Sequence, residues 1–310
     1  MNKPKLQGHS AILIAGIIFG LNIPVTKTLL SSGFITPSAI SLMRALFAGL
    51  AFWITSFFFE REKVAPKDLG MLALGGLLGI TLNQLAFIEG LSMTSPVDAS
   101  IVTTVTPILV MIIAAFMLKE PITFQKTAGV LIGATGAVIF ILQTHEDGGS
   151  GNISGMILCF LSSLSYAFYL VLIKPITLRY KPVTIMSWMF LFATLFLLPF
   201  GIGDILKIGS IEKILDPDIS FRLFFTLFAA TYCTYLLIPY ALQRIRPTTI
   251  SMYNYVQPIV AASVAVICGQ GSFTLTKGLA AVLVFLGVYF VTQSKSRADV
   301  EKSLQNNIRQ

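Results

Sequence analysis

The chain consists largely of apolar stretches about twenty residues long, separated by short polar connections. Because the hydrocarbon core of a bilayer is about 30 Å thick, a transmembrane helix needs about twenty apolar residues. Backbone polar groups in lipid must also be paired within helices or closed barrels. We therefore predict an all-α integral membrane protein with ten transmembrane helices, at residues 9–28, 37–59, 69–91, 97–118, 124–142, 153–176, 183–203, 220–242, 249–268 and 274–293.

The composition also favours a chain embedded in lipid. Hydrophobic residues make up 55% of its 310 residues, charged residues make up only 12%, and the mean hydropathy is +0.81. A soluble domain carries about 25% charged residues, so this chain has too few to solvate its surface in water. The net charge of +8 does not indicate nucleic-acid binding, because the basic residues are scattered singly and form no basic face.

Cysteine and histidine chemistry has few residues to use. Cys159, Cys233 and Cys268 lie inside apolar runs without CxxC spacing, and the histidines, His9 and His145, lie at the edges of predicted spans. We interpret the cysteines as packing residues. No GxxxxGK[ST] loop that could hold a nucleotide occurs. We expect no cofactor and no metal.

The distribution of lysine and arginine predicts the orientation in the membrane. If the N-terminus is cytoplasmic, inner segments hold 16 of the 22 basic residues, outer segments hold five, and Arg44 lies within the second span. Cytoplasmic loops of membrane proteins carry this excess. We expect a multi-pass protein of the cell inner membrane with both termini in the cytoplasm, ending in a cytoplasmic tail at residues 294–310.

The two halves of the chain are similar to each other. When residues 96–136 are shifted by 151 positions without gaps, they match residues 247–287 at nine of 41 positions, and Pro107 falls on Pro258. Prolines in register make an internal repeat the better interpretation of a modest identity among apolar sequences.

An odd number of spans in each half has a physical consequence. Equivalent helices then enter the membrane from opposite sides, and such inverted repeats are frequent in secondary transporters. At an offset of 147, Lys27 also lies on Lys174. We predict two inverted five-helix repeats, at residues 9–142 and 153–293, that exchange inward-open and outward-open states of similar energy by alternating access.

Short motifs follow one another in a recognisable order. They are Phe19-Gly20-Leu21-Asn22 with Lys27, Arg44, Pro107, Lys119-Glu120-Pro121-Ile122-Thr123, Tyr166-Ala167 with Lys174, and Gln257-Pro258. In order and spacing they resemble the ten-helix EamA-type branch of the drug/metabolite transporter superfamily across about residues 9–293. The resemblance implies transport of amino acids, other metabolites or amphipathic drugs, without a prosthetic group or ATP hydrolysis. Family members often have Trp where Phe19 stands and an acidic residue where Gln270-Gly271 stands.

Polar and aromatic side chains on shared helical faces form the candidate substrate site. In lipid their amides and hydroxyls would be left without partners, so they must point into the bundle. For single polar residues the alternative is hydrogen bonding between helices, worth under about 1 kcal/mol per pair on average. The predicted substrate-binding residues are Asn22, Asn83, Gln84, Tyr166, Tyr169, Tyr235, Tyr253, Asn254 and Gln257.

Pro107 and Pro258 are predicted to break the fourth and ninth helices near mid-membrane. Each proline removes a backbone donor, and the freed carbonyls must find partners in protein or in a water-filled cavity. The alternative is a packing kink without contact to a substrate.

Charged residues within the hydrocarbon are few. Arg44 lies about two turns into the second span, while Glu89 ends the third span and Asp98 begins the fourth, both on the outer side. A lone charge there costs at least about 2.5 kcal/mol. We therefore predict an outer gate in which Arg44 pairs with Glu89 in preference to Asp98, and a remaining carboxylate can couple transport to protons. Alternatively, both acids flank a loop in headgroup water, where Asp98 caps its helix. Lys27 and Lys174 are expected to snorkel to opposite interfaces; the alternative is that they bind a carboxylate of the substrate.

The leading hypothesis is a membrane transporter that moves a small amphipathic metabolite, such as an amino acid, across the inner membrane. The alternatives are an intramembrane enzyme acting on a lipid-linked substrate and a receptor or channel, and ten spans with inverted repeats argue against the latter. The enzyme would need clustered carboxylates or a histidine site, and a channel would need a charge ring or a carbonyl filter. Neither pattern occurs in the sequence. The expected partners are the substrate, the lipid bilayer and protons, with no nucleic acid, and we expect a monomer or a weak dimer.

The predicted orientation can be tested by labelling introduced cysteines. In a variant whose native cysteines are replaced, Ser150→Cys should react with a membrane-impermeant maleimide in intact cells, because its connection lies outside. Ser303→Cys should remain unlabelled until the membrane is opened. The reverse labelling pattern would overturn the orientation.

Overall fold

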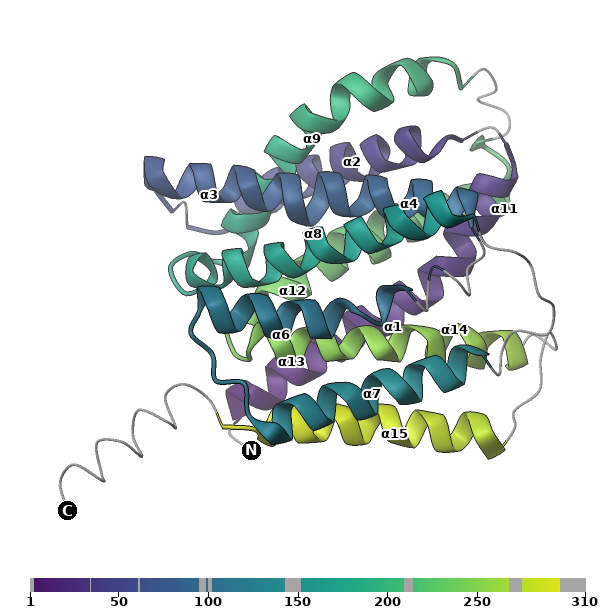
Figure 1. The fold of residues 1–310 in the computed structure, drawn as a ribbon. Helices are drawn as coiled ribbons and strands as arrows, with labels where there is room; N and C mark the ends of the chain where they lie inside the picture. Colours follow the sequence, from purple (N-terminus) through teal and green to yellow (C-terminus); the bar gives the residue numbers. More distant parts are fainter. Residues whose placement is uncertain are drawn as a thin grey trace.

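The computed structural model describes residues 3–33, 35–60, 62–94, 99, 102–142, 152–208, 214–267 and 275–295. In these ranges the chain folds into helices that lie side by side in one bundle (Figure 1). In chain order they are α1 (Lys3–Ser31), α2 (Pro37–Ser56), α3 (Pro66–Gly76), η1 (Leu77–Leu82), α4 (Asn83–Met93), α6 (Thr106–Met117), α7 (Phe124–Leu142), α8 (Ile153–Thr177), α9 (Pro182–Leu206), α11 (Pro217–Phe224), η2 (Phe225–Cys233), α12 (Thr234–Leu242), α13 (Pro247–Met252), η3 (Tyr253–Tyr255), α14 (Val256–Ile267) and α15 (Leu275–Gln293).

The length and surface of the helices match a lipid environment. Within the described ranges, six helices are long and apolar enough to cross a membrane, and shorter apolar helices include Thr106–Met117 and Gly278–Gln293. Large apolar side chains such as Phe116 and Phe124 are 82% and 91% exposed, as expected where lipid is the solvent. Six of the ten predicted spans thus coincide with long helices, and the other four fall on the shorter α6, α7, α13–α14 and α15.

Proline sets the start of several helices. Its missing N–H is not needed in the first turn and its fixed φ angle suits a helix. At α2 a side-chain cap adds to this effect, because Thr36 Oγ1 accepts a hydrogen bond from the backbone N–H of Ala39 at 3.2 Å. The prolines at these first positions are Pro37, Pro66, Pro182, Pro217 and Pro247.

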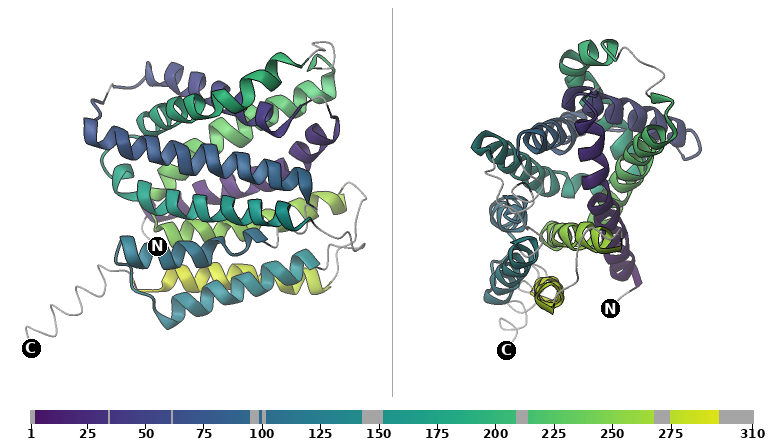
Figure 2. Two further views of the ribbon diagram at one scale, coloured as in Figure 1. Left: turned by 45° about the horizontal axis from the view of Figure 1, so that its top comes forward. Right: turned by 90° about the vertical axis from the view of Figure 1, so that its right-hand side faces the viewer.

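The helices pack in defined pairs. α2 packs on α9, α7 on α15, both α4 and α6 on α8, and both α12 and α14 on α1 (Figure 2). Arg246 Nη2 donates to the carbonyl of Val291 at 2.9 Å, and Gly8 lies against Arg244 and Ile245. The beginning of α1 and the end of α15 therefore lie at one end of the bundle, which we call the proximal end; the opposite end is the distal end.

Several described helices depart from α-helical geometry near their middle. η1 and η2 are π-helical segments, and η3 is a single 3₁₀ turn before α14. A turn at residues 104–105 precedes α6. Pro107 is the second residue of α6 and Pro258 the third residue of α14, so each proline stands in the first turn after an interruption. There the preceding backbone is not α-helical, so the missing N–H and the ring of the proline interrupt no regular α-helix.

Close glycine contacts hold α7 against α15. A Cβ atom at Gly287 would lie 2.6 Å from the carbonyl oxygen of Gly129. We expect Gly287→Ala to lower the free energy of unfolding by about 1 to 3 kcal/mol, the usual range for overpacking, measured as a lower melting temperature in detergent. Gly203→Ala is the matched control, because nothing lies within 4 Å of the added methyl group. Equal melting temperatures for the two variants would contradict the close contact.

Candidate functional site

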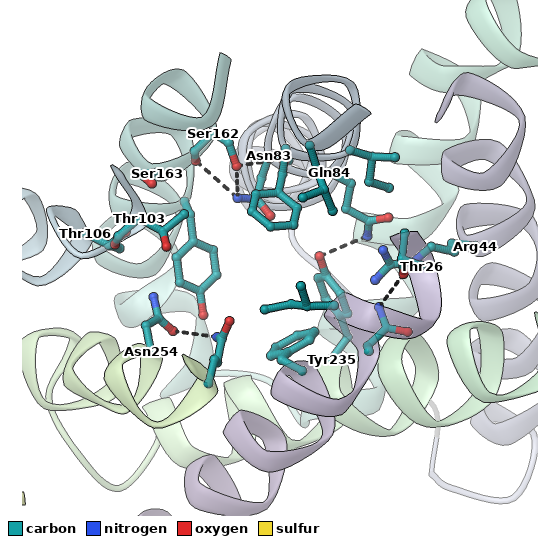
Figure 3. A pocket seen from close by; sticks show the side chains of 18 residues that line it. Thr26, Arg44, Asn83, Gln84, Thr103, Thr106, Ser162, Ser163, Tyr235 and Asn254 are labelled. Carbon is teal, nitrogen blue, oxygen red and sulfur yellow. Dashed lines mark hydrogen bonds between the residues drawn. The ribbon is translucent and has the colours of Figure 1, made fainter. Parts of the chain in front are cut away.

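A cavity of about 130 Å³ lies inside the bundle, between α1, α2, α4, α8, α12 and the η3–α14 segment (Figure 3). Its wall combines amides, hydroxyls and one guanidinium with apolar and aromatic side chains. The residues that line it are Phe19, Asn22, Ile23, Thr26, Arg44, Asn83, Gln84, Phe87, Ile88, Leu91, Thr103, Thr106, Ser162, Ser163, Tyr166, Tyr235, Asn254 and Gln257.

Seven of the nine side chains that the sequence assigns to substrate binding line this one cavity, together with Arg44. Tyr169 and Tyr253 do not. Thr103 and Thr106 line it without having been predicted, since they stand in an apolar run where their three-residue spacing beside Pro107 is the only signal. The seven are Asn22, Asn83, Gln84, Tyr166, Tyr235, Asn254 and Gln257.

Tyr169 is a packing residue in this structure. Its side chain is fully buried, and its ring covers Gly79 so closely that a Cβ atom there would lie 2.5 Å from the ring. Its hydroxyl has no hydrogen-bond partner in the described part of the chain. Tyr253 also points away from the cavity, because its hydroxyl is 2.9 Å from Nδ1 of His9 near the beginning of α1.

The wall formed by α4 and α8 is closed by reciprocal hydrogen bonds. Asn83 Nδ2 donates to the Ser162 carbonyl at 3.1 Å and to its hydroxyl at 3.0 Å, and Ser162 Oγ donates to the Asn83 carbonyl at 2.8 Å. Figure 3 shows the two side chains facing each other across the helix pair. Asn83 therefore forms hydrogen bonds between helices and also lines the cavity, so the two alternatives considered for such residues, interhelical bonding and a place in the substrate site, both apply to it.

The π-helical segment η1 supplies carbonyl groups that side chains satisfy. A π-helical turn shifts the backbone hydrogen bonds from their α-helical partners. Ser165 Oγ donates to the carbonyl of Leu78 at 2.7 Å, and Tyr235 Oη donates to that of Gly79 at 3.2 Å. The same Tyr235 oxygen accepts from Gln84 Nε2 at 2.9 Å, so the irregular backbone positions the tyrosine at the cavity.

Asn22 is fully engaged with neighbouring threonines. Its Nδ2 donates to Thr26 Oγ1 at 3.0 Å, and its Oδ1 accepts from Thr226 Oγ1 at 3.0 Å. Asn254 and Gln257 differ, because only a long contact of 3.4 Å joins Gln257 Nε2 to Asn254 Oδ1. In the described ranges neither of these amides has another side-chain hydrogen bond, so both are available to a ligand in the cavity.

Arg44 does not make the ion pair with Glu89 that the sequence predicts. Arg44 is 6% exposed and bonds neutral groups of η2: its Nε donates to Thr231 Oγ1 at 2.8 Å and its Nη2 to the Ala230 carbonyl at 3.3 Å. Glu89 is exposed on the surface of α4. The prediction rested on the similar depth of the two residues in the membrane, but Glu89 lies on the outward face of its helix. Asp98 lies outside the described residues.

The groups on the cavity wall are suited to binding an amphipathic molecule. No Asp or Glu side chain is among its lining residues. Among the described residues, no group of three His, Cys, Asp or Glu side chains could hold a metal ion. The arrangement offers one cation, several hydrogen-bonding groups and apolar surface for an amphipathic molecule.

The comparisons with known proteins agree with this architecture. A model of the EamA-like transporter family matches residues 6–142 and again residues 153–293. An "uncharacterized transporter" of Archaeoglobus fulgidus is 26% identical over 262 residues, covering 84% of this chain and 91% of the relative. A "probable amino-acid metabolite efflux pump" of Salmonella typhimurium is 26% identical over 293 residues, covering 92% and 94%. A solved crystal structure shares the fold, with a TM-score of 0.72 over 93% of this chain and 96% of that chain at 16% identity.

The two buried tyrosine hydroxyls beside η1 should respond differently to removal. Tyr169→Phe takes away a buried hydroxyl without a partner, so the melting temperature should stay unchanged or rise. Tyr235→Phe loses bonds to Gln84 and Gly79 and should lower the free energy of unfolding by about 1 to 3 kcal/mol. Equal losses in the two variants would show that the Tyr169 hydroxyl is hydrogen-bonded after all.

Proposed function

Because the chain belongs to the EamA-like transporter family, we propose that it moves a small amphipathic metabolite across the cell inner membrane by alternating access, with the described cavity as the substrate site. The observation that carries this proposal is the convergence of seven predicted polar and aromatic side chains and Arg44 on one cavity inside the bundle. A soluble amphipathic molecule finds there both apolar cover and hydrogen-bonding groups.

The architecture proposed is ten spans in two inverted repeats, at residues 9–142 and 153–293. Packing that is symmetric between the halves supports it. α4 and α6 pack on α8 as α12 and α14 pack on α1, while α2 packs on α9 and α7 on α15. The π-helical segments also correspond, since η1 (Leu77–Leu82) shifted by 151 positions falls within η2 (Phe225–Cys233).

Two lysines provide a second line of support for the inverted repeat. Lys27 Nζ donates to the carbonyl of Leu91 at 2.8 Å, and Lys174 Nζ donates to that of Leu242. The two carbonyls are 151 positions apart and lie near opposite ends of the bundle. Each lysine places its charge at the C-terminal end of a helix, where the macrodipole favours a cation.

Hydrogen bonds between the halves at the proximal end support alternating access. Glu120, which is ion-paired within its own half with Lys126 at 2.6 Å, accepts a hydrogen bond across the halves from Thr248 Oγ1 at 3.2 Å. Arg179 forms an ion pair with Asp68 at 2.8 Å. The cavity reaches toward the distal end, because Leu91 is near the last residue of α4. Access from the proximal end would require these bonds to separate.

An amino acid or related metabolite is the substrate class we favour. A relative with the printed name "probable amino-acid metabolite efflux pump" is 26% identical over nearly the whole chain. The cavity has the mixed character that such molecules require, with aromatic surface from Phe19 and Phe87 beside the amides of Asn254 and Gln257.

Transport should be tested with the purified protein in proteoliposomes, using pooled radiolabelled amino acids and metabolites with and without a pH gradient. The wild-type protein should accumulate at least one compound above protein-free vesicles. If uptake rises with the gradient, protons are the coupling ion. Equal counts with and without protein for every pool would refute the proposed transport.

Asn254→Ala should separate substrate binding from packing. We expect it to weaken substrate binding by about 1 to 3 kcal/mol, the scale of a buried polar group left without its partner, while the melting temperature in detergent changes little. Ser263→Ala, on the following helix α14, is the matched control, because Ser263 is exposed and its hydroxyl donates to the Ile259 carbonyl of its own helix. If melting temperature and binding fall together in Asn254→Ala, Asn254 is a packing residue.

A further inference from the structure

We propose that Arg44 anchors the carboxylate of the transported substrate, and that the substrate is a small carboxylic acid with an amine or hydroxyl group next to the acid. This proposal rests on the proposed function, since it assigns the substrate class of the same cavity. It replaces the predicted gating role of Arg44 by one in direct contact with substrate.

Arg44 has no counter-ion among the described residues. In the part of the chain that the structure describes, the ion-paired carboxylates Glu60, Asp68, Glu120, Asp204 and Asp218 are each matched to another basic residue. Arg44 is bonded to a hydroxyl and a carbonyl, which orient it, and it has no acidic partner among the residues that the structure describes. A buried charge needs an opposite charge beside it, and the cavity that Arg44 lines is the space from which one can come.

The guanidinium of Arg44 keeps donors that are free to bind a ligand. An arginine side chain has five N–H donors in a planar fork. Nε and Nη2 each donate once to η2, and no described residue accepts from Nη1. The donors that remain match the two oxygens of a carboxylate, which arginine binds in a bidentate manner. Figure 3 shows the Arg44 side chain beside Thr26, close to Gln84 on the cavity wall.

Gln84 provides a hydrogen-bond acceptor close to the Arg44 guanidinium. Gln84 is buried and lines the cavity, its Nε2 donates to Tyr235, and its Oε1 has no hydrogen-bond partner among the described residues. A buried acceptor favours a ligand that brings a donor. An ammonium or hydroxyl group next to the carboxylate would supply it.

The apolar part of the cavity wall can hold the rest of the ligand. Apolar side chains also line the cavity, among them Phe19, Phe87 and Ile88. They would cover an apolar substituent. An anchored carboxylate, a neighbouring donor and an apolar substituent together describe amphipathic amino acids and hydroxy acids.

The experiment compares matched acids and amides by thermal stabilisation of the purified protein. The probes are L-leucine, L-phenylalanine and L-threonine, each beside its amide, together with sodium chloride alone. At least one acid should stabilise the wild-type protein at concentrations at least about tenfold lower than its amide does. This preference should disappear in Arg44→Gln and be partly kept in Arg44→Lys, because lysine restores the charge without the fork.

Arg222→Gln is the matched control, since Arg222 is outside the cavity and pairs with Asp218 near the beginning of α11; it should keep the wild-type preference. Equal stabilisation by acid and amide, stabilisation by no acid, or an undiminished preference in Arg44→Gln would each overturn the proposal. Stabilisation by chloride alone, with no further effect of any acid, would show an inorganic anion site and also overturn it. Should Arg44→Gln fail to fold, the wild-type acid-to-amide ratio and its change in Arg44→Lys decide the question.

Uptake measurements separate this proposal from the proposed function. Transport of pooled neutral or cationic compounds without any preference for acids would leave transport standing and reject the carboxylate anchor. Arg44-dependent binding of acids without uptake of any compound would leave the anchor standing and reject transport.

Discussion

The structure depends on one requirement of the bilayer, that every backbone N–H and C=O group in hydrocarbon must be paired. Regular helices meet it without help from side chains. Where the helices depart from α geometry, side chains complete the pairing: Ser165 and Tyr235 bond carbonyls of η1, and Thr231 Oγ1 donates to the Thr226 carbonyl in η2. At the turn before α6, Tyr255 Oη donates to the Thr104 carbonyl at 3.0 Å. Irregular backbone therefore occurs here together with hydroxyl groups, and one of these, that of Tyr235, belongs to a residue that lines the cavity.

This requirement explains why polar residues in the spans are good indicators of the site but not of their individual roles. Asn22 and Asn83 satisfy their amides within the protein, whereas Gln84, Asn254 and Gln257 keep hydrogen-bonding capacity in the cavity. Some polar residues of the spans thus form hydrogen bonds between helices, while others remain available to a substrate. In membrane helices such hydrogen bonds contribute modestly to stability, so their positioning of the cavity wall is the larger effect.

Sequence patterns predicted the helical membrane class and eight of the 18 residues that line the cavity, because hydrophobicity and helical periodicity are local properties. The direction in which each helix face points within the bundle, and the places where the backbone leaves α-helical geometry, are not local properties. Tyr166 and Tyr169 share a helical face, yet Gly79 of the π-helical η1 receives the ring of Tyr169 and only Tyr166 reaches the cavity. Glu89 has the depth expected for a partner of Arg44 but faces outward. Both outcomes follow from tertiary packing that a single sequence does not encode in its spacing.

The glycine contacts between α7 and α15 have a mechanical consequence. Gly129, Gly133 and Gly136 bring the backbone of α7 against α15 around Gly287. Because glycine has no rotamers to lose, this interface forms without side-chain ordering. A slip by one helical turn would push bulkier neighbours such as Phe290 into a gap that only hydrogen atoms fit. The close contacts therefore oppose sliding of α7 along α15, and in the proposed alternating access we expect the two helices to move together as one unit.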